Sequence, residues 1–138
     1  MEKYTLQNDV KVFGFQVKSF PEGLGDAFDS LAGMIHGDKV RSYFGICEMR
    51  KNQLVYLAAA EERNENEARI YNCERFIIEK GDYLTISLTG WRSKTDSIKG
   101  LFDKLHEHPD TDHFKPIVEW YKDDHEMLCM VRMRVNQE

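Results

Sequence analysis

The 138-residue chain has little of what marks membrane-spanning, secreted or nucleic-acid-binding proteins. Its longest uninterrupted apolar run, Leu54–Ala60, is too short to cross a bilayer. The first residues lack the apolar stretch of a signal peptide, so a cytoplasmic location is expected. Acidic residues outnumber basic ones by 24 to 19, and the net charge is −5. Phosphate backbones should repel such a chain, so neither nucleic acid nor membrane is an expected partner.

Cysteine is also scarce, and the three cysteines, Cys47, Cys73 and Cys129, are far apart. Isolated cysteines without a Cys-x-x-Cys pair are typical of reduced packing residues. The glycines do not have the spacing of a phosphate-binding loop. The segment His106–His113 contains metal-ligating residue types, but it follows a helical pattern and includes a Pro-Asp turn. We therefore expect a solvated helix end there, with no metal and no cofactor.

What the sequence does contain is alternation of apolar residues, which is typical of strands, around two helical patterns. In the first half, Val10–Phe20 alternates and predicts a half-buried strand. The apolar spacing in Leu24–Ile35 predicts an amphipathic helix, ended by Gly37. Arg41–Glu48 and Gln53–Ala60 predict two strands joined by a polar hairpin turn.

The segment Glu61–Asn72 is dominated by charged and amide side chains and predicts a surface connection, with a short helix as the alternative. The second half then repeats the order of the first. A helix is predicted at Thr95–Leu105, and a hairpin turn is predicted around Gly81. The strands predicted in this half are Glu74–Ile78, Tyr83–Leu88, Phe114–Tyr121 and Glu126–Val135.

The two halves match when their apolar patterns are aligned, with Phe28–Ile35 lying over Ile98–Leu105. The predicted fold class is therefore α+β: a duplicated strand-helix-strand-strand module with an antiparallel sheet, pseudo-twofold halves and a central ligand cleft. One domain would cover residues 1–138, with halves at about 1–62 and 73–138. The alternative is an α+β domain in which degenerate apolar patterns match by chance.

Glu119 is the most informative position for function. The two-residue period of a strand puts Ile117, Glu119 and Tyr121 on one face and Val118 and Trp120 on the other. A buried carboxylate needs a partner or a raised pKa. The functional hypothesis is an anionic anchor in an aromatic cavity, ready for a cationic ligand. The alternative is a half-exposed glutamate on an edge strand, paired with a neighbouring lysine or arginine.

Aromatic residues at strands and strand ends support the functional hypothesis. Rings around a desolvated cation contribute about 0.5–2 kcal/mol each. Trp91 follows Gly90 at the start of a helix and is expected to line an opening. Ordinary core packing is the alternative for most of the rings. The predicted ligand-binding residues are Glu119, Tyr121, Trp91, Tyr43 and Tyr56, and no catalytic residue is assigned.

Three segments carry a resemblance to a known family: Tyr43–Ile46, Lys80–Trp91 and Ile117–Tyr121. They resemble, in order, the aromatic-Gly-Ile strand, the Gly-x-Tyr strand with its following Gly turn, and the Glu-x-Tyr strand of the GyrI-like effector-binding domain. That family includes the DNA gyrase inhibitor protein and the ligand-sensing halves of AraC-type and MerR-type drug-responsive regulators. The resemblance runs from about Val10 to Val135.

The resemblance implies a central cleft for amphipathic, often cationic compounds. It also implies that Glu119 faces the cation, with Tyr121 beside it. The closing strand departs from the family, because it lacks the common Ile-x-Val/Ile-Pro-Val ending, and no DNA-binding module is attached.

The leading hypothesis is a binding module for small hydrophobic cations that acts in sensing or sequestration. One alternative is a small hydrolase of reactive, DNA-alkylating natural products, in which Glu119 would steer or activate water. The other is a protein-interaction module, like the gyrase inhibitor, with an unidentified protein partner. Haem is not expected, because no histidine is placed in the cleft.

Overall fold

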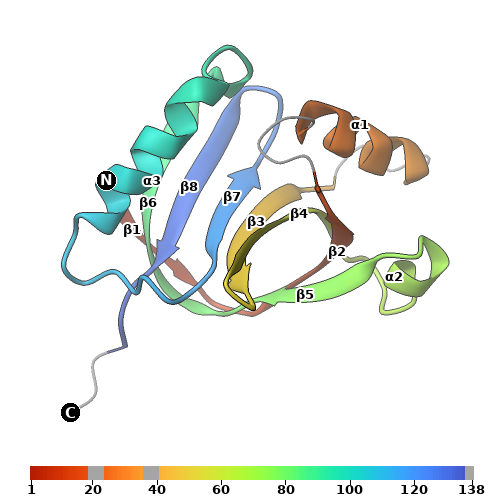
Figure 1. Ribbon diagram of the computed structural model, residues 1–138, viewed down its shortest axis with the longest axis horizontal. Helices are drawn as coiled ribbons and strands as arrows, with labels where there is room; N and C mark the ends of the chain where they lie inside the picture. Colours follow the sequence, from red (N-terminus) through yellow and green to blue (C-terminus); the bar gives the residue numbers. More distant parts are fainter. Residues whose placement is uncertain (19–23, 36–40, 136–138) are drawn as a thin grey trace.

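The computed structural model describes residues 1–18, 24–35 and 41–135 (Figure 1). These residues form an eight-stranded antiparallel sheet in the order β1-β6-β8-β7-β3-β4-β2-β5. The strands are β1 Glu2–Leu6, β2 Val10–Gln16, β3 Tyr43–Arg50, β4 Gln53–Glu61, β5 Glu74–Ile78, β6 Gly81–Thr89, β7 Ile117–Tyr121 and β8 Glu126–Arg132. The helices are α1 Leu24–Met34, α2 Glu67–Ile70 and α3 Ile98–His106, with 3₁₀ turns η1 Trp91–Ser93 and η2 Thr95–Ser97.

Two amphipathic helices cover one face of the sheet. Helix α1 packs on β4 through its buried Leu31, and α3 packs on β8 and β6 through Phe102 and Leu105. The central pair of strands, β3 and β7, therefore lies between the two helices (Figure 1). Both helices occur where the apolar spacing predicted them, so an α+β fold is confirmed.

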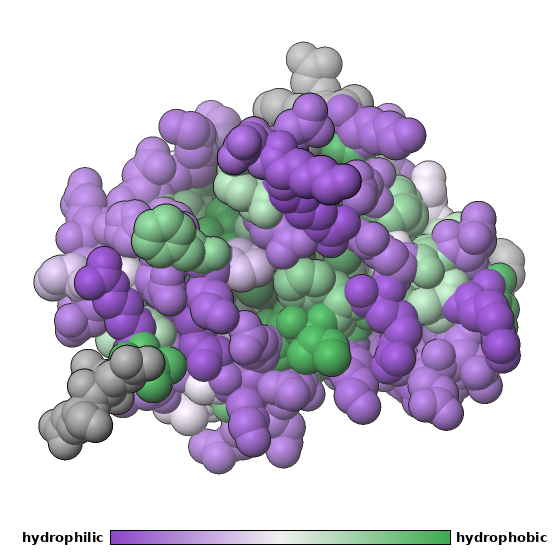
Figure 2. Space-filling model, turned by 60° about the horizontal axis from the view of Figure 1, so that its bottom comes forward, coloured by the Kyte–Doolittle hydropathy of each residue, from purple (hydrophilic) through white to green (hydrophobic). Residues whose placement is uncertain are grey.

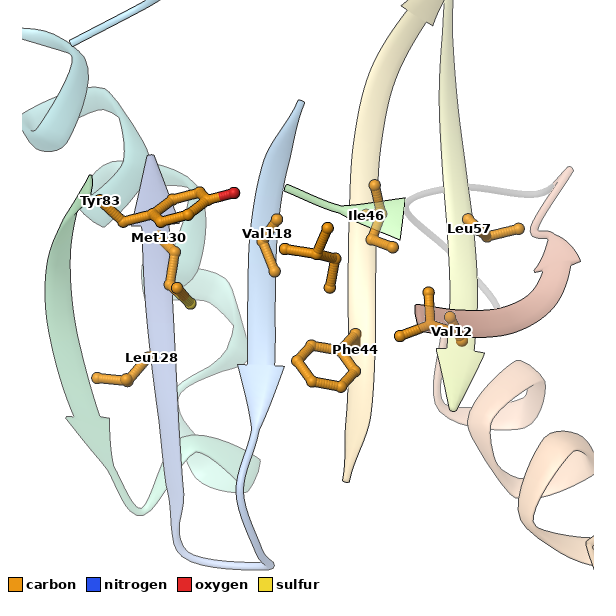
Figure 3. Packing of buried hydrophobic residues seen from close by; sticks show 10 residues of the cluster. Val12, Phe44, Ile46, Leu57, Tyr83, Val118, Leu128 and Met130 are labelled. Carbon is orange, nitrogen blue, oxygen red and sulfur yellow. The ribbon is translucent and has the colours of Figure 1, made fainter. Parts of the chain in front are cut away.

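The opposite face of the curled sheet carries an apolar cluster. Figure 3 shows its side chains on one side of strands β2, β3, β4, β6, β7 and β8. Burying a large apolar side chain of this kind contributes about 1.5–3 kcal/mol. Leu6 of β1 and Phe76 of β5 pack against the same cluster, so the two edge strands help to close it.

The hairpin expected between the third and fourth strands is present. Arg50 pairs with Gln53, and the two residues between them, Lys51 and Asn52, have φ values of 50° and 66°. Two consecutive left-handed residues make a turn whose twist matches that of the flanking strands. This hairpin fixes which residues of β4 lie opposite those of β3.

The second hairpin expected from the sequence, around Gly81, is wrong. Strand β5 pairs with β2, whereas β6 pairs with β1 and β8. The sequence analysis located no strand at β1, whose residues are mostly exposed, and this strand takes one edge of β6. Because β6 is paired on both sides, β5 pairs with a distant strand instead.

The segment Glu61–Asn72 contains the short helix α2, which was the alternative, and it is not merely a surface connection. Glu67 and Ala68 are buried, and a guanidinium nitrogen of Arg41 lies 2.7 Å from the Glu67 carboxylate. A buried ion pair therefore links this connection to Arg41, two residues before β3. Charge alone did not indicate burial, because the partner lies far away in the sequence.

Several predicted bounds shift. The strand predicted to end at Phe20 ends at Gln16 as β2, and residues 19 and 20 and the helix end at Gly37 lie outside the described residues. The strand predicted from Phe114 begins at Ile117, and Phe114 is 97% exposed. Of the helices described here, none is long and apolar enough to cross a membrane.

Candidate functional site

Glu119 lies in the middle of β7, on the face that the two helices cover. It is opposite Gly45 of β3 on one side and Cys129 of β8 on the other. Glu119 is only 8% exposed to solvent. Its neighbour Val118 points to the opposite face and belongs to the apolar cluster (Figure 3). The alternative of a half-exposed edge-strand glutamate is therefore wrong, because β7 is a central strand.

Two phenol hydroxyls donate hydrogen bonds to the same carboxylate oxygen. The Tyr121 hydroxyl lies 2.9 Å from Glu119 Oε1, and the Tyr56 hydroxyl, from β4, donates to that oxygen as well. Tyr56 reaches Glu119 across Gly45, where any Cβ would overlap both the Tyr56 hydroxyl and the Glu119 oxygen. A glycine inside a strand is typical of such a close approach.

The charge environment of this carboxylate is set by the side chains around it. Among the residues that the structure describes, no lysine, arginine or histidine forms an ion pair with Glu119. Burial raises the pKa of Glu119, while the hydrogen bonds from Tyr56 and Tyr121 act in the opposite direction. An ionised carboxylate in such surroundings is costly unless a positive charge is brought to it.

The other titratable groups around Glu119 remain protonated at neutral pH. Burial and the nearby Glu119 charge raise the pKa of Cys47 to about 11 and that of Cys129 to about 12. The same two causes raise the pKa values of Tyr56 and Tyr121. Glu119 is thus the acidic group of this cluster whose charge is set by the balance between burial, which raises its pKa, and the two phenol hydrogen bonds, which lower it.

Aromatic rings from α1 and η1 contact the phenols that donate hydrogen bonds to Glu119. Phe28 of α1 makes edge contacts with Tyr121 at 5.3 Å and with Tyr56 at 6.5 Å between ring centroids. Trp91 of η1 contacts Tyr121 at 4.7 Å, and its indole nitrogen donates to the Asp123 carbonyl oxygen at 2.9 Å. The phenols on Glu119 therefore contact one ring from each helical side.

The structure brings most of the predicted site residues together. Glu119, Tyr56 and Tyr121 share hydrogen bonds, and Trp91 joins them through its contact with Tyr121. Tyr43 lies opposite Tyr121 in the β3–β7 register. It packs against a second group of buried residues, beside α1, that includes Phe13 and Leu31.

Phe28 and Gly45 were not among the predicted site residues. Phe28 was counted only in the apolar spacing of the helix. Gly45 was visible as a lone glycine inside a strand, which is the available signal for a close approach of other groups.

Two small hollows are lined by described residues, and both lie away from Glu119. One is apolar and lies on the opposite face of the sheet, between Phe44, Trp120 and Met130. The other includes Ile77, Tyr83 and Arg132. Figure 2 shows the side of the molecule where β1 and β5 lie, with apolar side chains gathered near its middle among hydrophilic ones. The central cleft expected from the sequence is not one of these two hollows.

The histidine-rich segment His106–His113 brings two imidazole rings together. The rings of His106 and His113 lie 4.8 Å apart between centroids. Within the described ranges, no group of three or more histidine, cysteine, aspartate or glutamate residues is arranged to hold a metal ion.

Curled antiparallel sheets with helices on one face are found in other proteins of similar size. The sequence of this chain matches no protein-family model and no curated protein. An integron cassette protein from the mobile metagenome of Vibrio cholerae is similar in structure, with a TM-score of 0.71 at 14% identity over 96% of this chain and 95% of that one.

Two further solved structures share the fold. SAV2435, solved bound to tetraphenylphosphonium, has a TM-score of 0.70 at 14% identity, covering 97% of this chain and 94% of its own. A protein from Staphylococcus aureus MU50 described as a bacterial transcription regulation protein has a TM-score of 0.65 at 11% identity, covering 97% of each chain. At these identities the likeness shows the fold, which is consistent with a GyrI-like fold.

Proposed function

We propose that this protein binds small hydrophobic cations at Glu119, in sensing or sequestration. The observation that carries the proposal is a buried carboxylate that receives hydrogen bonds from two phenols and no ion pair from any described cation. A cationic ligand would supply the missing charge. The surrounding rings of Phe28, Trp91 and Tyr121 would contact its apolar parts.

The expected energies favour a ligand that combines charge with apolar surface. A charge-assisted contact in a partly dry site contributes about 1.5–3 kcal/mol. Each ring face on a desolvated cation adds about 0.5–2 kcal/mol. A strongly hydrated ion would lose its water at this site, and its contacts there would not offset the free energy of dehydration. A lipophilic cation has little hydration to lose. The fold neighbour bound to tetraphenylphosphonium supports this ligand class.

Ligand entry requires the rings over Glu119 to move. Trp91 belongs to a 3₁₀ turn of three residues, and its ring is held by one hydrogen bond to the Asp123 carbonyl oxygen and by packing. Phe28 makes edge-type ring contacts with Tyr56 and Tyr121. Both rings can therefore leave Tyr121 by side-chain rotation, which is a common change on binding.

The proposal includes membership of the GyrI-like family, an origin of the domain by duplication, and a cytoplasmic place of action. The strand order supports the duplication. Counted outward from the centre of the sheet, the first half contributes β3, β4 and β2, and the second half contributes β7, β8 and β6. When β2, β3 and β4 are matched with β6, β7 and β8, the two halves arrange their strands in the same order. Glu119 and Gly45 face each other on the two central strands.

A titration of tetraphenylphosphonium and of neutral triphenylphosphine oxide tests the proposal. Glu119→Gln keeps the shape of the side chain and removes its charge. It should weaken the phosphonium by roughly ten- to a hundredfold, since each 1.4 kcal/mol is tenfold, and leave the neutral compound unchanged. Glu65→Gln, at an exposed position, is the matched control and should behave as wild type. Equal affinities of wild type and Glu119→Gln for the phosphonium would contradict the site.

A further inference from the structure

Within residues 1–18, 24–35 and 41–135, no cationic side chain forms an ion pair that would balance a negative charge on Glu119. The titratable groups that face it are Tyr56 from β4, Tyr121 from β7, Cys47 from β3 and Cys129 from β8, and all are neutral near pH 7. Helix α1 and turn η1 contribute rings.

The two cations next in sequence to site rings, Lys122 after Tyr121 and Arg92 after Trp91, have other partners. The Lys122 ammonium lies over the Trp120 ring, 4.8 Å from its centroid. The Arg92 guanidinium lies over the Trp91 ring, 4.7 Å from its centroid, and pairs with Asp124 at 2.8 Å. The phenols can only donate or accept hydrogen bonds. The charge of the cluster therefore depends on Glu119 alone.

We infer that the site exchanges a proton for its ligand: Glu119 is a neutral carboxylic acid when the site is empty and becomes a carboxylate when a permanent cation binds. This inference rests on the proposed function. Both phenols donate to Oε1, so Oε2 is the oxygen left to carry the proton. On binding, the O–H bond of the acid breaks, the proton passes to the solvent buffer, and the cation takes its place. The net charge of the buried cluster stays the same.

The exchange has a defined pH dependence. Burial without a counter-charge raises the pKa of Glu119 in the free protein, and an adjacent cation lowers it again in the complex. Between these two pKa values, binding releases one proton, so affinity rises about tenfold per pH unit. Above the pKa of the free protein no proton is released, and the affinity reaches a plateau.

The exchange also distinguishes two kinds of ligand. A permanent cation, such as a phosphonium or a quaternary ammonium, must expel the Glu119 proton into solvent. A weakly basic amine that is neutral at the assay pH can accept this proton inside the site, so its binding releases none. Acidification should therefore weaken permanent cations while leaving such amines bound, until the amine itself becomes protonated in solution.

Isothermal titration calorimetry with tetraphenylphosphonium tests the inference. Titrations at several values between about pH 5 and pH 8, in paired buffers of different ionisation enthalpy, measure the protons released per ligand. We expect wild type to release close to one proton at the acidic end, with affinity rising about tenfold per pH unit there. Glu119→Gln should bind more weakly, release no proton and show no pH dependence. The exposed control Glu65→Gln should match wild type.

The outcomes separate the inference from the proposed function. Binding of the phosphonium with no proton release and constant affinity over the whole range would overturn the proton exchange and leave cation binding intact. A release that persists in Glu119→Gln would assign the proton to another group and would also overturn the inference. Failure of wild type to bind the phosphonium at any pH would remove both proposals.

Discussion

Strand β7 has two chemically different faces, although only five residues build it. Val118 and Trp120 point into an apolar cluster or pack against it. Glu119 and Tyr121 point to the helix-covered face, where a buried carboxylate lies among phenols and rings. Both faces are buried, so burial alone does not distinguish a stabilising surface from a binding surface. What distinguishes them is whether the protein itself supplies the partners that the buried side chains require, including a counter-charge for a buried carboxylate.

This comparison predicts that stability and ligand binding can be changed separately. Substitutions on the apolar face should lower the free energy of unfolding without altering the site. Substitutions around Glu119 should alter binding more than folding. Three variants test this separation, from the largest expected effect to the smallest.

The largest effect is expected from Phe44→Ala on the apolar face. Phe44 is 5% exposed and belongs to the apolar cluster (Figure 3). Removing its ring leaves a cavity and should lower the free energy of unfolding by about 3–5 kcal/mol, measured by urea denaturation. The affinity of the folded variant for tetraphenylphosphonium should stay that of wild type. A marked loss of affinity would show that the two faces are coupled.

An intermediate effect is expected from Gly45→Ala, which inserts one methyl group on the Glu119 face. The new Cβ would overlap the Tyr56 hydroxyl and the Glu119 oxygen, so these groups must move apart. We expect a loss of about 1–3 kcal/mol in stability, as for other overpacked positions, together with weaker phosphonium binding.

The matched control for this variant is Gly100→Ala in α3. Among the described residues, no atom lies within 4 Å of the place that a Cβ would take at Gly100. Alanine is a better helix former than glycine, so this control should gain up to about 1 kcal/mol. If both variants behaved alike, the close approach at Gly45 would not be the cause.

The smallest effect is expected from Tyr121→Phe. This variant removes one of the two hydrogen bonds to Glu119 and should lower the free energy of unfolding by about 0.5–1.5 kcal/mol. That hydrogen bond lowers the pKa of Glu119. Without it the pKa rises further, so the pH at which phosphonium affinity reaches its plateau should move upward in calorimetry.

Tyr4→Phe is the matched control, because Tyr4 packs against Trp120 on the other face and is 36% exposed. It should change neither the stability nor the pH of the plateau. A plateau that stays unchanged in Tyr121→Phe would show that the Tyr121 hydroxyl does not stabilise the charged form of Glu119.

Much of the local structure could be predicted from the sequence. Alternation placed Val118 and Glu119 on opposite faces, and the apolar spacing of Leu24–Ile35 and Thr95–Leu105 located the two long helices. These signals are local, because each arises from the period of one element. They were sufficient to single out Glu119 and three of its aromatic neighbours, Tyr56, Trp91 and Tyr121, as candidates, but not Phe28.

The pairing of distant segments was decided only by the tertiary structure. The turn residues around Gly81 suggested that β5 and β6 form a hairpin, yet β6 pairs with β1 and β8, and β5 pairs with β2. The donation from Tyr56 to Glu119 likewise depends on β3 lying between β4 and β7, with Gly45 leaving room. Local period determines which way a side chain points, whereas the strands that pair beside it determine what it meets. Whether the Glu119 carboxylate has a counter-charge is a property of that nonlocal packing.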